Sequence, residues 1–473
     1  MTFTRDLAWQ HLELMYRSSI AYQFARYALG LNYESLPQDV VHQAKRCLLD
    51  ALGCAIGGHN APGLPICESV VQELGGLEES TVFCSGMRTN ARNATLVNSF
   101  LVRFLDYNDL GGGGHNSDSI PGIIAVAERE KTGGRDFLTS LVISYELGAR
   151  VAESTKITHE VAWSAKGWNI DVRGGLSMPP TLGKLMGLSE DQIANAIGIC
   201  ASHSLPLAVL DTDKEENTMS KNLRFGFVSC DAILACMLAK KGFTGPIRVV
   251  EGESGIRQVL LQGDMDLEHM VDFSGWRILL TRFKSFCVNA ATHGHVMATL
   301  SIVKENDLKP EDIGAVRIKT TLSEWRHTTA LPKKYPRNAE SADHSSFYTT
   351  AIAIKERACG PESFDPEKLT DPVVLELIEK ITVERDPSLP ERGRQAISEI
   401  TTKDGRKFQK RIDTPHGFGD DPLTDAELED KFRGMAIKHM DEKQIQKIFD
   451  AVWNIENLDD ISKLTTLMVF PSQ

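Results

Sequence analysis

Helical periodicity runs through the first 275 residues of this 473-residue sequence. Apolar residues recur there every three or four positions, the spacing of a helix with one buried face. One of these segments begins with Ser189 and has Gln192 three residues later, which is a capping-box pattern. Another is rich in Ala, Cys and Ser, and such small residues indicate a closely packed central helix. The segments with this pattern are 36–58, 95–109, 136–154, 188–203 and 227–246.

The pattern changes after about residue 276. "GAVRIKTTL" alternates between apolar and polar residues, and 396–413 contains two alternating runs around Asp404-Gly405, a hairpin signal. Helical segments lie between these strands, and helical periodicity returns after Thr424. We therefore predict a mostly α fold, in which a large all-helical domain contains an inserted, smaller α+β domain. The expected bounds are 1–275 for the first part of the helical domain, 276–413 for the α+β domain, and 414–473 for the return to the helical domain.

Charge and cysteine content narrow the functional class. The chain has 52 Lys plus Arg against 64 Asp plus Glu, a formal net charge of −12, which argues against a nucleic-acid surface. No run of about 18 apolar residues occurs, so no membrane span is expected. The N-terminus does not resemble a secretory signal. The nine cysteines form no C-x-x-C pair, which predicts reduced, buried thiols in a cytoplasmic protein without a zinc or iron–sulfur site.

The stretch "FLDYNDLGGGGHNSDSIPG" is the most unusual local feature. Asp106 and Asp109 precede four glycines, and His115 follows them directly. Glycines permit backbone angles that other residues resist, so the loop could fold tightly and aim His115 into a space beside Asp106. Ser117 or Asp118 is expected to cap the next helix. From these residues alone, a mobile solvent loop with solvated acids remains an equal alternative.

Five segments in order resemble the MmgE/PrpD family, also described as the 2-methylcitrate dehydratase and cis-aconitate decarboxylase family. The five matches occur in order over some 300 residues, which argues against a chance resemblance. Any one of the segments alone would be weak evidence. The segments are "AKRCLLDALGCAIGG", "FLDYNDLGGGGHNSDSIPGIIAVAE", "TMSKNLRFGFVSCDAILACMLAKKGFTGP", "RFKSFCVNAATHGHVMA" and "ADHSSFYTTAIAI". The resemblance implies a helical domain with an α+β lid, a site between the two, and a homodimer. It also implies activity with no metal and no organic cofactor.

The resemblance also implies a set of site residues. An acid beside an imidazole forms a proton-transfer pair, and lysines would bind a carboxylate. Catalytic roles are expected for Asp106, His115, Lys221, Lys284 and Tyr348. Substrate binding is expected for Asp109, Asn169, Arg224, His293 and His344. We also expect Asp343 to Tyr348 to begin one helix, with His344 and Tyr348 on a shared face.

One position departs from the family pattern. Members usually carry a histidine in a "G-W-H" motif, whereas this sequence reads "KGWNID", with Asn169 after Trp168. An amide keeps hydrogen-bonding capacity but does not act as an acid or base at neutral pH. The expected function is therefore a lyase acting on a small anionic polycarboxylate, a hydro-lyase similar to 2-methylcitrate dehydratase. The alternatives are a cis-aconitate-type decarboxylase, a carboxylate epimerase or isomerase, and a helical dimer without enzymatic activity.

Overall fold

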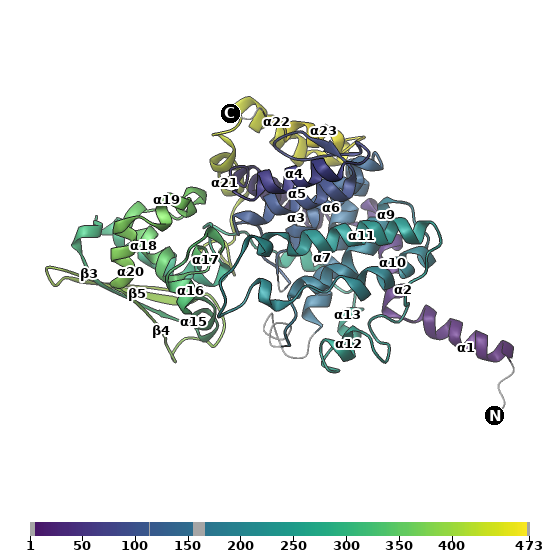
Figure 1. Cartoon of the computed structure of the whole chain (residues 1–473), viewed down its shortest axis with the longest axis horizontal. Helices are drawn as coiled ribbons and strands as arrows, with labels where there is room; N and C mark the ends of the chain where they lie inside the picture. Colours follow the sequence, from purple (N-terminus) through teal and green to yellow (C-terminus); the bar gives the residue numbers. More distant parts are fainter. Residues whose placement is uncertain (1–4, 113, 155–165, 471–473) are drawn as a thin grey trace.

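The computed structural model describes residues 5–112, 114–154 and 166–470. Two lobes are visible in Figure 1, a large helical lobe and a smaller lobe that contains a sheet. This arrangement confirms the predicted mostly α fold with a smaller α+β part. The helices of the large lobe are α1 (Arg5–Arg17), α2 (Ile20–Gly30), α3 (Gln38–Gly57), α4 (Leu64–Leu74), α5 (Ala91–Phe104), α6 (Ile120–Arg129), α7 (Gly134–Glu153), α9 (Gly174–Leu185), α10 (Glu190–His203), α11 (Arg224–Lys240), α12 (Ile256–Val259), α13 (Leu267–Met270), α21 (Asp425–Ala436), α22 (Glu442–Trp453) and α23 (Ser462–Leu467).

Helices α3, α5, α7, α9 and α11 form the centre of the large lobe, where they pack against one another. Almost every residue of α7 is buried, and the small residues of α11 allow close approach to α5, α9 and α10. The predicted capping box at the start of α10 is present, because Ser189 and Gln192 each bond the backbone of the other. Two short strands, β1 (Ser80–Thr81) and β2 (Arg88–Thr89), pair beside this core.

The segment Met219–Lys240 is, among the described residues, long and apolar enough to cross a membrane by length and composition. However, 67% of its most apolar window is buried inside the protein. The core helix of a globular protein passes the same test, so this segment is weak evidence for a membrane span.

The smaller lobe contains a four-stranded sheet in the order β4-β3-β5-β6. Strand β3 pairs with β4 in parallel and with β5 antiparallel, and β5 and β6 form the hairpin predicted around Asp404-Gly405. Helix α14 packs on β5 and β6, and α18 packs on β4. The elements are α14 (His293–Glu305), β3 (Ile313–Thr320), α15 (Leu322–Thr328), α16 (Leu331–Lys334), α17 (Ala339–Ala342), α18 (Ser346–Glu356), α19 (Pro366–Leu369), α20 (Pro372–Glu379), β4 (Ile381–Arg385), β5 (Ala396–Thr402) and β6 (Lys407–Ile412).

The chain returns to the large lobe after the sheet. Helix α21 packs along α3, which belongs to the N-terminal part of the chain. Helices α22 and α23 follow α21 on the same side of the large lobe (Figure 1). The smaller lobe is therefore an insertion between two parts of the helical lobe. Residues from both lobes meet around Asp106, which lies just after the end of α5.

Candidate active site

Asp106 is the centre of a buried cluster of charged side chains. Helix α5 ends at Phe104, and the chain then turns with Asp106 in the left-handed conformation (φ +45°). Its carboxylate Oδ1 accepts hydrogen bonds from Arg103 and from Lys284, whose Nζ lies at 2.8 Å. Burial alone would raise the pKa of Asp106, but Arg103, Lys284 and Lys221 outweigh burial and hold it well below its usual range. Asp106 is therefore ionised at neutral pH.

The glycine loop folds back on itself. Gly111 and Gly114 exchange two backbone hydrogen bonds, at 2.9 and 3.2 Å, and Gly113 between them lies outside the described residues. Gly112 has φ +53°, and a Cβ placed there would lie 2.4 Å from the Cβ of Ala149 on α7. A side chain at 112 would therefore require both a strained backbone and a displaced helix.

The second constraint on the loop comes from Arg173. A Cβ at position 114 would lie 2.9 Å from both terminal nitrogens of the Arg173 guanidinium. With glycine there, Arg173 reaches past the loop and donates a hydrogen bond to the backbone oxygen of His115 at 2.8 Å. The glycines thus let the loop pack tightly enough to present His115 to Asp106.

The His115 imidazole faces Asp106 through one nitrogen and has the other free. Its Nε2 lies 3.4 Å from Asp106 Oδ1, while its buried Nδ1 has no hydrogen-bond partner among the described residues. Burial, with Arg103 and Lys284 adding to its effect, holds the pKa of His115 well below its usual value. The ring is therefore neutral, and we assign its proton to Nε2 beside the carboxylate. That tautomer leaves a lone pair on Nδ1, which is the atom that can accept a proton.

Lys221 brings the two lobes together at the cluster. It lies in the 3₁₀ helix η5 (Met219–Leu223) and is fully buried. Its Nζ lies 3.5 Å from Asp106 Oδ2 and 3.1 Å from Asp343 Oδ2, which comes from the smaller lobe. An ammonium has three donors. Lys284 uses two of its donors on Asp106, and Lys221 makes one hydrogen bond to Asp343, so each retains capacity for an anion.

His344 lies opposite Lys221, and its protonation follows from its neighbours. The Asn289 side-chain oxygen accepts a hydrogen bond from the backbone of Ala291 at 2.9 Å, which orients the Asn289 amide nitrogen toward His344 Nε2 at 2.8 Å. Nε2 is therefore the acceptor, and Nδ1 carries the proton that it donates to Asp343. Burial, together with Lys221, lowers the pKa of His344 to about 4. His344 is thus a neutral, fully engaged ring.

A second group of charges adjoins the first through Arg224. Its guanidinium binds Asp171 at 2.5 Å and Asp211 at 2.7 Å. Asn169 caps the 3₁₀ helix η3 (Ile170–Arg173) by accepting a hydrogen bond from the backbone nitrogen of Asp171 at 3.0 Å. The amide therefore positions the carboxylate that holds Arg224. Asp211 in turn lies 3.5 Å from His344 Nε2, so the two groups are continuous.

Asp109 anchors the glycine loop, and the side-chain caps predicted for the next helix are not formed. The carboxylate of Asp109 accepts hydrogen bonds from the backbone and hydroxyl of Ser117 and from the Tyr145 hydroxyl, at 2.6 to 3.1 Å, and so anchors the loop. Neither Ser117 nor Asp118 caps a helix, because their side chains bond Asp109 and Asn108 instead. The prediction of a cap there was wrong, since the buried acids compete for these groups.

Tyr348 lies apart from the cluster. Its hydroxyl donates a hydrogen bond to the Ser363 carbonyl oxygen at 2.7 Å, and its ring packs with Phe364 in the core of the smaller lobe. Helix α18 begins only at Ser346, so His344 lies in the turn before it and does not share a helix face with Tyr348. The expected common helix was wrong because the Ser345 side chain caps α18 after His344.

His293 also contacts backbone rather than the charged cluster. Its Nδ1 lies 3.2 Å from the Asn289 carbonyl oxygen, and its Nε2 accepts a hydrogen bond from the Phe286 backbone nitrogen at 3.4 Å. Both ring nitrogens are thus used to hold the turn from Phe286 to Asn289. This turn carries Asn289 to His344, so His293 acts on the cluster through the backbone.

Several cluster residues were not predicted from the sequence. Asp343 stands beside His344 in the recognised "DHS" motif, so its position was available. Asn289 likewise lies within the recognised segment "RFKSFCVNAATHGHVMA", whereas the rest lie outside the five recognised segments. The unpredicted members are Arg103, Arg173, Asp211, Asn289 and Asp343.

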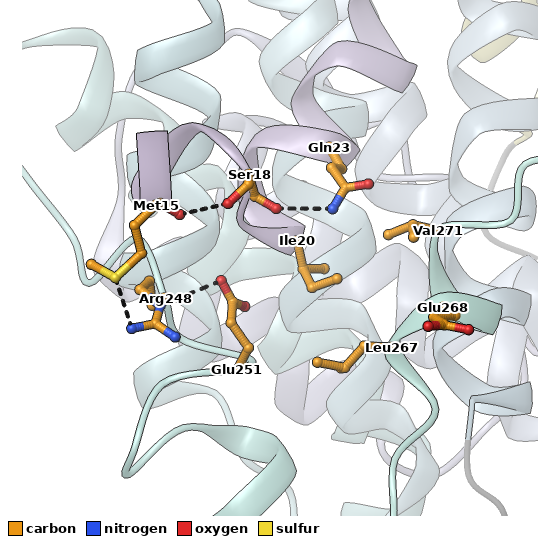
Figure 2. Close-up of a pocket in the computed structure, with 9 residues that line it drawn as sticks. All are labelled: Met15, Ser18, Ile20, Gln23, Arg248, Glu251, Leu267, Glu268 and Val271. Atoms are coloured by element: carbon orange, nitrogen blue, oxygen red, sulfur yellow. Dashed lines mark hydrogen bonds and ion pairs between the residues drawn. The ribbon is translucent and has the colours of Figure 1, made fainter. Parts of the chain in front are cut away.

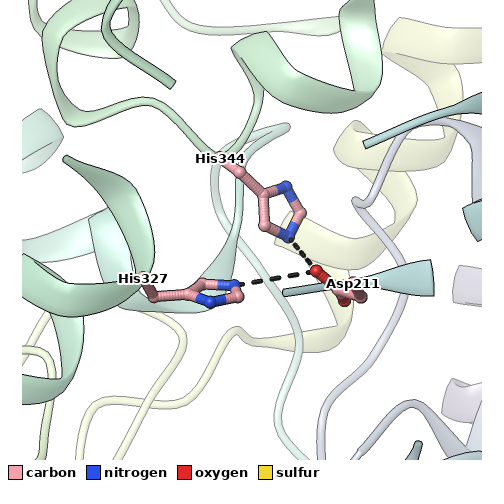
Figure 3. Close-up of side chains that lie close together, drawn as sticks. All are labelled: Asp211, His327 and His344. Atoms are coloured by element: carbon pink, nitrogen blue, oxygen red, sulfur yellow. Dashed lines mark ion pairs between the residues drawn. The ribbon is translucent and has the colours of Figure 1, made fainter. Parts of the chain in front are cut away.

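Two groups of side chains in the described part of the chain offer metal-ligand atoms within 4.8 Å of one another. Figure 3 shows one of them, with both histidine rings directed at the same carboxylate. The groups are Asp211 with His327 and His344, and Asp106 with Asp343 and His344. Arg224 and Lys221 already pair with these carboxylates, and His344 Nε2 accepts from Asn289. Because cationic side chains already occupy these carboxylates, the cluster suits an anionic ligand better than a metal cation.

A surface pocket of about 260 Å³ lies away from the cluster, between the start of α2 and residues 248–271. In Figure 2 Arg248 approaches Met15, and the Ser18 carbonyl oxygen accepts a hydrogen bond from Gln23 at 3.0 Å. Its lining combines few charged groups with apolar surface. The pocket therefore lacks the convergent acids and ammonium groups found around Asp106.

Two family models match most of this chain. The family model for the MmgE/PrpD N-terminal domain matches residues 22–268, and that for the MmgE/PrpD C-terminal domain matches 286–455. The chain therefore belongs to the MmgE/PrpD family.

Named relatives include decarboxylases and dehydratases. Human cis-aconitate decarboxylase is 27% identical over 97% of this chain and 96% of its own length. A cis-aconitate decarboxylase-like protein of Aspergillus oryzae is 24% identical over 95% of this chain and 97% of its own. The 2-methylcitrate dehydratase of Salmonella typhi is 24% identical over 76% of each. Both activities are lyase reactions, so the relatives support a lyase at the level of the family.

Proposed function

We propose that this protein is a lyase that removes water from, or adds it to, a small polycarboxylate in the manner of a 2-methylcitrate dehydratase. The observation that carries the proposal is the neutral His115, whose Nε2 faces Asp106 and whose buried Nδ1 has no hydrogen-bond partner in the described part of the chain. Dehydration begins with removal of a proton next to a carboxylate, and this ring is prepared to accept one.

The surrounding ammonium groups suit the charge that develops in such a reaction. His115 Nδ1 takes the proton from the substrate carbon, and the electron pair that remains is delocalised into the adjacent carboxylate. Lys221 and Lys284, each with donor capacity left, stabilise that carboxylate as its charge grows. The pair then forms the double bond while the β-hydroxide departs with a proton from an ammonium, giving water. Asp106 stabilises the imidazolium formed on His115.

Decarboxylation of a cis-aconitate-type acid is the second candidate. It is supported by the extent of the matches, because human cis-aconitate decarboxylase and the cis-aconitate decarboxylase-like protein of Aspergillus oryzae match 97 and 95% of this chain, against 76% for the bacterial dehydratase. That reaction starts with loss of carbon dioxide and ends with proton delivery to carbon. A neutral His115 is the wrong form for that delivery, so an ammonium would have to supply the proton.

Asn169 bears on the substrate. It stands where the family motif has histidine, and its side-chain oxygen is occupied as a helix cap. An imidazole at position 169 would supply an acid–base group there, and the Asn169 amide does not. We therefore propose a substrate that differs from the standard family substrates near Asn169.

One assay separates the chemistries. Purified protein is incubated in deuterium oxide with a panel of di- and tricarboxylates, and each mixture is followed by proton NMR. Water loss or addition supports the hydro-lyase, and loss of carbon dioxide supports the decarboxylase. Deuterium uptake without either indicates epimerisation or isomerisation. If no member of the panel reacts or exchanges, the proposed function is wrong.

We also propose that the protein forms a homodimer, as the family resemblance implies. Support comes from an exposed apolar stripe along α11, formed by Phe227, Leu234 and Met237, which are 53, 45 and 38% exposed. Their spacing places them on one helix face. Light scattering should report a dimer, and Leu234→Glu should shift it to a monomer. A wild-type monomer at micromolar concentration would contradict this proposal.

A further inference from the structure

Lys333 is a buried cation that stands apart from the other buried lysines near the cluster. It lies in α16, has no exposed surface, and its Nζ has no hydrogen-bond partner among the described residues. Its neighbour Lys334 is exposed to solvent in part and lies 3.5 Å from Glu379. Burying an unpaired ammonium is unfavourable, so a protein keeps one only where something else compensates. Lys333 therefore differs from the buried lysines 221 and 284, which have carboxylate partners.

The charges around Lys333 are those of the candidate active site. Burial lowers its pKa to about 8, and Asp211 opposes this most strongly, followed in the same direction by Asp343 and Asp213. Lys221 repels it and lowers the pKa further. The preceding helix α15 places this segment beside the cluster, because its His327 lies 3.8 Å from Asp211 Oδ1 and its ring lies 5.2 Å from that of His344. Among the described residues, Lys333 Nζ is hydrogen-bonded to none of the carboxylates that pair with Lys221 and Arg224.

The segment that carries Lys333 is fixed against the large lobe. Asn217 donates hydrogen bonds to the Glu340 carbonyl oxygen at 2.9 Å and, from its backbone nitrogen, to the Ser341 hydroxyl at 3.0 Å. His327, which precedes α16 in the sequence, bonds Asp213 at 2.8 Å. Lys333 is therefore held in place beside the cluster from both ends of its segment, rather than projecting from a free loop.

We propose that Lys333 binds a further carboxylate of the substrate, so that the site selects tricarboxylates over dicarboxylates. This inference rests on the proposed function, in which Lys221 and Lys284 stabilise the carboxylate next to the reacting carbon. A third ammonium within the same buried region supplies the partner for an additional anionic group, and the substrate carboxylate completes the ion pair that the protein leaves open. The residue thus sets substrate class, while His115 and the two other lysines perform the reaction.

The test compares two acids that differ by one carboxylate. Propane-1,2,3-tricarboxylate and glutarate share two terminal carboxylates, and only the former has the central one. Calorimetric titration of the wild-type protein should show tighter binding of the tricarboxylate. Lys333→Met should weaken the tricarboxylate by about ten- to a hundredfold, the usual loss for a charge-assisted hydrogen bond. Glutarate affinity should change less than threefold. Lys334→Met is the matched control and should leave both affinities unchanged.

Stability separates a binding role from a structural one. Removing an unpaired buried charge should leave the thermal midpoint of Lys333→Met equal to or above that of the wild type, whereas loss of a structural contact would lower it. Lys333→Gln provides a second uncharged variant if the methionine does not fold. Unchanged tricarboxylate affinity, or an equal loss for both acids, overturns the inference and leaves the proposed function intact. Failure of the wild type to bind either acid contradicts the proposed function, and this inference with it.

Discussion

A methyl group at position 112 should damage this protein more than its size suggests. Gly112 has φ +53°, and an L-residue in the left-handed region costs about 1–2 kcal/mol. The added Cβ would also lie 2.4 Å from the Cβ and 2.8 Å from the Cα of Ala149, which belongs to the buried helix α7. Overpacking of this kind typically costs about 1–3 kcal/mol. We expect Gly112→Ala to lower the free energy of unfolding by about 2–5 kcal/mol, and to reduce turnover by displacing the loop that carries His115.

Denaturant titration with a second substitution tests the cause. In the double variant Gly112→Ala with Ala149→Gly, one of the two colliding atoms is absent, so the effects should couple by about 1–3 kcal/mol. Gly434→Ala is the control, because nothing lies within 4 Å of its Cβ and an exposed helical glycine gains about 0.5–1 kcal/mol from this change. A Gly112→Ala protein as stable and active as the wild type, or additive effects in the double variant, would refute the steric argument.

Three further predictions follow from the cluster. Lys221→Ala and Lys284→Ala should weaken binding of a carboxylate analogue and slow turnover. Each should lower the free energy of unfolding by about 1.5–3 kcal/mol in denaturant titrations, because a buried carboxylate loses one of its charged partners while Arg103 still pairs with Asp106; unchanged values for both would place the anion site elsewhere. Turnover should survive dialysis against EDTA, and a loss that zinc or iron restores would contradict the mechanism. The acid limb of kcat/KM should lie below pH 6.5, because the base must be neutral and the pKa of His115 is lowered; a limb at or above pH 6.5 would show that another group is the base.

Local sequence signals predicted much of the fold. The periodicity of 136–154 corresponds to α7, Ser189 and Gln192 form the predicted cap, and Asp404-Gly405 turns the β5–β6 hairpin. Strand β4 was not predicted, since its five residues follow α20 directly and gain their definition from pairing with β3. The start of α18 was misplaced because a side-chain cap, which has a short sequence signal, decides it.

The site was predictable only where a residue stood in a recognised motif. Asp106, His115, Lys221, Lys284 and His344 meet in one buried cluster, although they are up to 238 positions apart. Position in a motif did not reveal which neighbours a side chain would find. Tyr348 is in the family motif but bonds Ser363, whereas residues such as Asp211 lie in an unremarkable polar loop and reach the cluster only through tertiary folding.

Turnover of His115 variants tests the proposed mechanism most directly. With the substrate identified by NMR, steady-state turnover is measured for wild type, His115→Ala and His115→Gln, alongside calorimetric binding of propane-1,2,3-tricarboxylate. His115→Ala should reduce turnover by about 10²–10⁴-fold, the range for a general acid–base group, while analogue affinity falls much less. His115→Gln keeps hydrogen-bonding capacity without proton transfer and should be equally slow. Near-normal turnover in His115→Ala would contradict the mechanism, and the glycine loop would then serve only to connect two helices.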